Sequence, residues 1–274
     1  MTPRASAGES LRHHWPEYLI EAWALGTFMV SAGVATVLFE YPGSWLRQAI
    51  ADADLRRALI GVAMGLTAVA LIYSPWGQRS GAHMNPAVTI TFLRLRKIAP
   101  WDAGFFMLAQ CAGGMLGVLL VCALFPDVFS ATPVNFIVTV PGPAGPGVAF
   151  LAEVAISAWL MATVLWVSGS DRFSGATGLC AGFLVALFIA FEAPYSGMSI
   201  NPARTLASAV PAGVFTHLWI YLLAPPLGML IVGELYQRTR HRQAICAKLH
   251  HGLLRPCIHC GHEPTVVARS LRIV

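Results

Sequence analysis

Two stretches of the sequence share the tripeptide that decides the fold: Ser80-Gly81-Ala82-His83-Met84-Asn85-Pro86-Ala87 and Ser196-Gly197-Met198-Ser199-Ile200-Asn201-Pro202-Ala203. Asn is a favoured helix N-cap, Pro fits the first helical position and Ala is the best helix former, so each Asn-Pro-Ala is expected to start a helix. One such tripeptide could arise by chance. Two in corresponding places indicate an internal repeat.

The composition of the chain is that of a membrane protein. Of its 274 residues, 56% are hydrophobic and only 11% are charged, whereas about 25% of the residues of a typical soluble domain are charged. This is too little charge to cover the surface of a water-soluble particle of this size. The composition therefore excludes an ordinary cytosolic enzyme, a disordered chain and a nucleic-acid-binding protein, and it predicts a multi-pass protein of the lipid bilayer.

Long apolar runs predict how often the chain crosses the bilayer, because a spanning helix needs about 20 apolar residues. Six runs qualify: 22–39, 58–78, 103–126, 154–170, 173–191 and the second part of 205–233. The stretches 80–93 and 193–210, which contain the two tripeptides, are too short to cross and are expected to be re-entrant. The predicted fold class is an all-α membrane protein with six transmembrane helices and two re-entrant half helices in an inverted repeat.

The distribution of Lys and Arg predicts the orientation. With the N-terminus inside, 14 of the 18 Lys and Arg residues fall on the inner side. The positive-inside bias then places both termini in the cytoplasm. The membrane is expected to be the plasma or inner membrane of the cell. The predicted segments are a cytoplasmic N-terminus (1–17), a first half (18–124) with a half helix at 85–95, an extracellular linker (125–146), a second half (147–237) with a half helix at 201–211, and a basic cytoplasmic tail containing Cys and His (238–274).

The two halves are predicted to be inserted in opposite orientations, because each has three spans, an odd number. Inverted repeats of this kind build a site where they meet at the bilayer midplane. Each half helix would begin there, with about half a positive charge at its N-terminal end. Two such ends aimed at one point would repel cations and protons, while Asn85 and Asn201 could donate hydrogen bonds to a passing water or hydroxyl group.

On these residues the chain resembles the major intrinsic protein family, the aquaporins and aquaglyceroporins. The resemblance covers roughly residues 18–237 and is carried by the segments 80–89 and 196–204. It implies a right-handed bundle of six tilted helices plus two half helices, four pores in a homotetramer, and passive conduction of water and small neutral solutes without a cofactor. The implied pore motifs are Asn85, Pro86, Ala87, Asn201, Pro202 and Ala203.

The family's outer constriction maps onto Arg204, Met198, Ile189 and, depending on a one-residue loop difference, Gly65 or Met64. Strict water channels tend to have a His and an aromatic residue where this chain has Ile189 and Gly65 or Met64. The resemblance therefore implies a wider, less polar constriction, which favours neutral solutes such as glycerol, urea, ammonia or peroxide beside water.

Other positions favour water. Thr205 and Ala209 stand where glycerol facilitators tend to have Asp and Lys. The pair Tyr221-Leu222 combines an aromatic residue typical of water channels with an aliphatic one typical of glycerol channels. We therefore expect a water channel with some leak of small solutes, and we keep a small-solute facilitator as the alternative.

The resemblance also implies roles for two carboxylates and a histidine. Glu21 and Glu153 would hold the backbone of the re-entrant loops, although intramembrane carboxylates often form proton relays instead. His83 would line the cytoplasmic approach to the pore, the alternative being a structural histidine. Glu192 would share a helix face with the constriction, and we hypothesise that it pairs with Arg204.

The tail contains the segment Cys257-Ile258-His259-Cys260-Gly261-His262. A C-x-x-C pair with nearby His can hold zinc, so Cys257, Cys260, His259 and His262 are candidate ligands. A second full pair at standard spacing is missing from the sequence. We therefore expect a solvated basic tail rather than a metal site.

Other classes of function are less well supported. The sequence contains no H-E-x-x-H, no Gly-rich phosphate loop and no G-x-S-x-G, so we predict no catalytic residue and no enzyme. A coupled carrier would reveal itself by saturable, gradient-driven uptake. A membrane scaffold or adhesion protein would form tetramers with little conduction.

Overall fold

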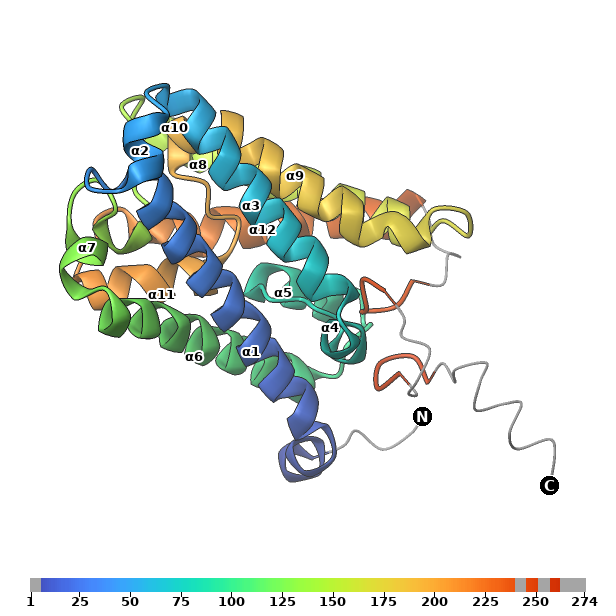
Figure 1. The fold of residues 1–274 in the computed structure, drawn as a ribbon. Coiled ribbons are helices and arrows are strands. Elements are labelled where there is room, and N and C mark those ends of the chain that lie inside the picture. Colours follow the sequence, from blue (N-terminus) through green and yellow to red (C-terminus); the bar gives the residue numbers. More distant parts are fainter. Residues whose placement is uncertain (1–5, 240–244, 251–256, 262–274) are drawn as a thin grey trace.

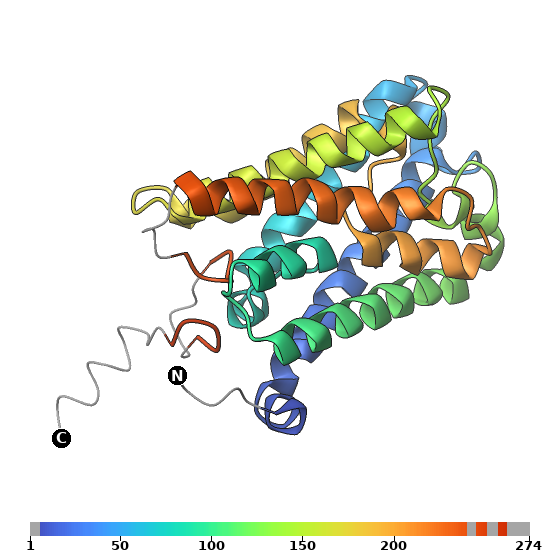
Figure 2. The same cartoon turned by 180° about the vertical axis from the view of Figure 1, so that it is seen from behind.

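Long helices run through the whole molecule in the computed structural model, which describes residues 6–239, 245–250 and 257–261 (Figures 1 and 2). Within these residues, six helical segments are long and apolar enough to cross a membrane. They are α1 (Ala7–Glu40), α3 (Ala53–Tyr73), α6 (Pro100–Leu124), α8 (Pro146–Ser168), α9 (Thr177–Phe191, extended by a 3-10 turn at Ser174–Ala176) and α12 (Leu218–Thr239). The prediction of an all-α membrane protein with six spans is confirmed.

Two half helices lie inside the bundle of long helices (Figure 1). They are α5 (Pro86–Arg94) and α11 (Pro202–Ala212), and each begins at the Pro of an Asn-Pro-Ala tripeptide. The preceding Asn of each is an N-cap in extended conformation. With 9 and 11 residues, neither helix is long enough to cross a bilayer.

Short helical turns connect the long elements. They are α2 (Trp45–Ala49), α4 (Pro75–Ser80), α7 (Pro126–Ser130), α10 (Ala193–Ser196) and a 3-10 turn at Asn135–Ile137. The turns α4 and α10 occupy corresponding places, because each directly precedes the loop that leads into a half helix. The internal repeat therefore extends to these connections.

α1 begins earlier than the apolar run 22–39 predicts. Its first turn is fixed by a capping box, in which the Ser6 hydroxyl accepts from the Glu9 amide at 3.3 Å and the Glu9 carboxylate accepts from the Ser6 amide at 2.7 Å. Farther along, the charge of Glu17 is paired with Arg79 at 2.8 Å. Hydropathy alone cannot detect such paired charges, so the predicted run is shorter than the helix.

Glycines allow the long helices to approach closely. A Cβ on Gly113 of α6 would lie 2.0 Å from the carbonyl oxygen of Ala22 on α1. A Cβ on Gly65 of α3 would lie 2.5 Å from the carbonyl oxygen of Gly182 on α9. Close packing through small residues is how helices associate in lipid, where no hydrophobic force drives them together.

The outward face of the bundle is apolar. Large hydrophobic side chains are exposed on every long helix, for example Leu19, Leu66, Leu108, Leu151, Phe183 and Leu227. A contiguous apolar surface of this kind is unstable in water and suits contact with lipid chains.

We expect Gly113→Ala to lower the apparent melting temperature of the purified protein in detergent, because the new Cβ would push α1 and α6 apart. Overpacking of this kind costs about 1–3 kcal/mol. Gly104→Ala is the matched control on the same helix, since a Cβ there would meet nothing within 4 Å. Equal melting temperatures for the two variants would contradict the close helix contact.

Candidate functional site

The two half helices meet end to end through their asparagine caps. The side-chain oxygen Oδ1 of Asn85 accepts from the Ala87 amide at 2.8 Å, and Oδ1 of Asn201 accepts from the Ala203 amide at 3.0 Å. In each case the side chain satisfies an amide that has no partner within its own helix. The N-terminal ends of α5 and α11 are thereby ordered at the junction.

The same two side chains also bind across the junction. The Asn85 amide donates to the carbonyl oxygen of Ile200 at 2.7 Å, and the Asn201 amide donates to the carbonyl oxygen of Met84 at 2.7 Å. Each loop is thus fastened to the cap of the opposite half helix. Because a carboxamide has two N–H donors, one of each remains for another acceptor.

The loops before the half helices are held by the two carboxylates near the starts of the halves. Glu21 accepts from the backbone amides of His83 and Met84 at 3.1 and 2.7 Å, from the Ser80 hydroxyl at 2.7 Å and from Gln110 at 2.8 Å. Both oxygens of the carboxylate are engaged in these bonds. This geometry fits a loop-holding role.

Glu153 repeats the arrangement in the second half. It accepts from the backbone amides of Ser199 and Ile200 at 2.6 and 2.7 Å and from the Ser196 hydroxyl at 2.8 Å. The loops need such support because Met84 and Ile200 both have φ of 50°, in the left-handed region. Gln110, which completes the first set, carries no sequence signal of its role.

A cavity of about 310 Å³ runs past the half-helix junction. Seven of the residues singled out from the sequence line it: Met64, His83, Asn85, Ile189, Met198, Asn201 and Arg204. Apolar side chains from α1, α8 and α9, such as Phe28, Leu160 and Val185, line it as well. The cavity therefore combines polar groups at the junction with hydrophobic walls.

The two alternatives for the constriction, Met64 and Gly65, lie on different faces of α3. Met64 lines the cavity, whereas Gly65 packs against Gly182 of α9. Gly65 is therefore a helix-packing residue rather than a pore-facing one. The Pro and Ala of the two tripeptides are buried in the half helices and are not among the residues that line the cavity.

Arg204 is held at the cavity by the segment before α8. Its guanidinium donates to the carbonyl oxygen of Ile137 at 2.9 Å and to the Thr139 hydroxyl. Neither Ile137 nor Thr139 belongs to a sequence motif that could have indicated this role. The hypothesis that Glu192 pairs with Arg204 is wrong for this structure, since the hydrogen bonds of the guanidinium go to Ile137 and Thr139 and the ion pairs among the described residues do not join it to Glu192.

At the opposite mouth, His83 contacts the C-terminal tail. Its Nε2 lies 2.5 Å from the carbonyl oxygen of Ala247, and its Nδ1 lies 3.0 Å from the Thr89 hydroxyl. A carbonyl oxygen can only accept, so Nε2 carries the proton. Leu249, two residues further along the tail, donates its amide to the Gly81 carbonyl at 3.3 Å and lines the cavity.

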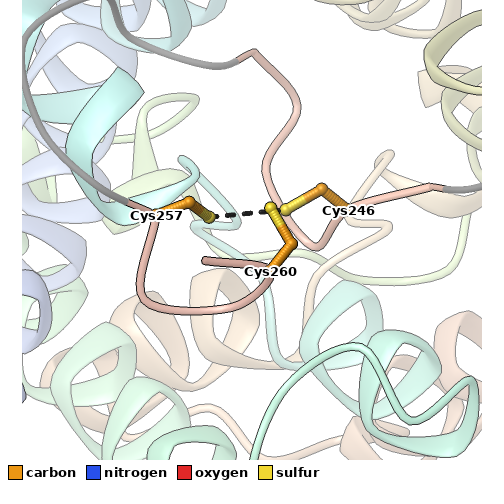
Figure 3. Close-up of side chains that lie close together, drawn as sticks. All are labelled: Cys246, Cys257 and Cys260. Carbon is orange, nitrogen blue, oxygen red and sulfur yellow. Dashed lines mark hydrogen bonds between the residues drawn. The ribbon is translucent and has the colours of Figure 1, made fainter. Parts of the chain in front are cut away.

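Three cysteines of the tail lie close together (Figure 3). Cys246 joins the predicted candidates Cys257 and Cys260, and the three sulfur atoms all lie within 4.8 Å of one another. His259 points elsewhere, with Nε2 3.2 Å from the Ser80 carbonyl oxygen, and burial lowers its pKa to about 4. His262 lies outside the described residues.

Comparisons with known proteins agree with this geometry. The family model for "Major intrinsic protein" matches residues 12–236. The chain is 37% identical to aquaporin NIP2-2 of Zea mays over 229 residues, covering 82% of this chain and 75% of that protein. It is also 37% identical to the putative aquaporin NIP4-1 of Arabidopsis thaliana, where the match spans 66% of this chain and only 62% of the relative.

A solved structure has the same fold. The aquaglyceroporin of Plasmodium falciparum superposes with a TM-score of 0.71 over 82% of this chain and 96% of that one, at 20% sequence identity.

We expect Glu153→Gln to reduce the yield of folded protein, because one of the two oxygens that accept loop hydrogen bonds becomes an amide donor facing other donors. An unsatisfied buried polar group costs about 1–3 kcal/mol. The measurement is the monodisperse fraction in size-exclusion chromatography after detergent extraction. Glu234→Gln is the control, because that partly exposed carboxylate pairs with Arg94 and holds none of the loops that precede the half helices. An unchanged yield together with altered solute preference would overturn the supporting role.

Proposed function

The chain belongs to the major intrinsic protein family, and on this premise we propose that it is a passive channel that conducts mainly water, leaks small neutral solutes and excludes ions and protons. The observation that carries the proposal is the cavity lined by Asn85, Asn201 and Arg204 at the junction of the two half helices. A catalytic function has no comparable support, because members of this family are channels.

Exclusion of ions follows from the charges at the cavity. The N-terminal ends of α5 and α11 meet there, and each carries about half a positive charge. Arg204 adds a full positive charge on the first turn of α11. A cation or a proton would therefore meet positive potential along the path, whereas a neutral molecule would find hydrogen-bond donors.

The preference for water rests on the polar network behind Arg204. The Thr205 hydroxyl lies 2.5 Å from that of Ser199, and the Tyr221 hydroxyl donates to the Ser196 carbonyl at 2.6 Å. These bonds support the rigid placement of the loop that carries Met198 and leads into Arg204. The guanidinium of Arg204 is then a hydrogen-bond donor held in one position. Such a donor favours a small permeant such as water, which can exchange its hydrogen bonds with the bulk solvent for a bond to this group.

A small-solute facilitator is the second candidate. Met64, Ile189 and Met198 line the cavity beside Arg204, so three of the four residues at the proposed constriction are apolar. An apolar wall opposite one donor suits a molecule with a hydrocarbon side and a hydroxyl side, such as glycerol. The relative permeability to water and to glycerol separates the two candidates.

The setting of the channel is also part of the proposal. The apolar outer face suits a bilayer, and the positive-inside bias favours cytoplasmic termini in the plasma or inner membrane. The last turn of α12 and the tail segment at the His83 mouth would then mark the cytoplasmic side. We further propose that four chains assemble into a homotetramer with one pore in each.

We expect proteoliposomes of the purified protein to shrink faster than empty liposomes when challenged with an impermeant osmolyte, and to re-swell only slowly when challenged with glycerol. Stopped-flow light scattering measures both. Fast re-swelling in glycerol would establish the facilitator instead. Permeability equal to that of empty liposomes with intact tetramers would favour the scaffold or adhesion alternative, and saturable gradient-driven uptake would favour a carrier.

We expect Arg204→Val to increase both glycerol permeability and proton leak several-fold, since it removes the charged donor and widens the passage. Glycerol flux is followed by light scattering and proton flux by a pH-sensitive dye trapped in the vesicles. Arg47→Val serves as the control, because Arg47 lies in the short connecting helix α2 and only reaches Glu40 at 3.9 Å. Glycerol and proton fluxes in Arg204→Val equal to those of the wild type would contradict the proposal that Arg204 lines the constriction.

A further inference from the structure

The tail segment 245–250 is seated on the loop that leads into α5. Ala247 is completely buried and Leu249 is only 7% exposed. The Ala247 carbonyl binds His83, the Leu249 amide binds the Gly81 carbonyl, and Leu249 reaches the cavity itself. The tail therefore covers the mouth of the cavity on the His83 side.

A second tail segment, 257–261, lies beside the first. His259 binds the Ser80 carbonyl, and its ring stacks with that of His83 at a centroid distance of 6.2 Å and an angle of 12°. The two segments are thus anchored side by side, one at the last residue of α4 and the other on the loop that follows it. Their positions bring cysteines that are 11 residues apart in the sequence to within 3.5 Å of each other.

Figure 3 shows three thiols that converge at this place, Cys246 from the first segment and Cys257 and Cys260 from the second. All three sulfur atoms lie within 4.8 Å of one another, and those of Cys246 and Cys257 are 3.5 Å apart. Tetrahedral zinc with Zn–S bonds of about 2.3 Å places its sulfur ligands roughly 3.8 Å apart. The 3.5 Å separation and the 4.8 Å upper limit are compatible with this value.

We propose that Cys246, Cys257 and Cys260 form a binding site for a thiophilic divalent ion such as Zn²⁺, and that the ion holds the tail over the mouth of the pore. Three thiolates leave one position of a tetrahedral ion for water or a nitrogen ligand. The sulfur ligands favour zinc over oxygen-seeking ions such as Mg²⁺ or Ca²⁺.

The closing role of the tail follows from the position of the three cysteines. Cys246 directly precedes Ala247, whose carbonyl binds His83. An ion that joins Cys246 to the segment anchored by His259 would restrict the tail to its seated position and reduce flow through the mouth. The closing role rests on the proposed channel function, whereas metal binding does not.

Metal binding is tested on the full-length protein in detergent, loaded with Zn²⁺, washed, and analysed by mass spectrometry for zinc per chain. We expect about one zinc per chain in the wild type, and a loss of at least tenfold in Cys246→Ser and in Cys257→Ser. Cys180→Ser, which changes a cysteine of α9, should retain the metal. When Co²⁺ replaces Zn²⁺, we expect the near-ultraviolet absorption of a thiolate-bound ion in the wild type. We expect this absorption to be absent in Cys246→Ser and in Cys257→Ser. Absence of zinc, or equal zinc in the Cys246→Ser variant, would overturn the site.

The consequence for flow is tested in proteoliposomes with Zn²⁺ or with a chelator on the tail side. We expect chelation to raise the water permeability of the wild type several-fold, and we expect Cys246→Ser to have the high value under both conditions. Zinc bound at one per chain with no change in permeability would overturn the closing role of the tail. Permeability at the level of empty liposomes in every variant would overturn the channel itself, while the zinc measurement would still decide the site.

Discussion

Burial of the two re-entrant loops depends on two carboxylates. Within a bilayer no water is available to pair exposed backbone groups, so irregular backbone survives only where the protein supplies partners. Glu21 and Glu153 supply them by accepting from the amides that precede each half helix. Once the loops are held, the asparagine caps can meet, and the cavity acquires its polar stripe. The end-to-end junction of α5 and α11 therefore depends on these hydrogen bonds to the loops.

Much of the fold could be predicted because hydropathy and helix-capping chemistry act locally. The six spans follow from uninterrupted apolar runs, and the half-helix starts at Pro86 and Pro202 follow from Asn-Pro-Ala. The early start of α1 could not be predicted in this way, because it depends on a capping box and on the pairing of Glu17 with a residue distant in the sequence. Long-range pairing leaves no mark on local composition.

The site was predictable in its residue types but less so in their contacts. Met64 and Gly65 are adjacent, and only the rotation of α3 against α9 decides which faces the cavity. Arg204 was singled out from its neighbours, yet its partners Ile137 and Thr139 lie in a segment without any motif. Likewise, Cys246 could not be joined to the C-x-x-C pair, because their approach depends on how the tail is folded against the loop.

The crosswise bonds between the half helices also bear on synthesis of the chain. The side chain of Asn85 binds the carbonyl oxygen of Ile200, which lies 115 residues later. At a translation rate of about 5–20 residues per second, the ribosome needs roughly 6–23 seconds to supply that partner. The crosswise bond can therefore form only after the second half has been synthesised, so the first loop is made well before its partner exists.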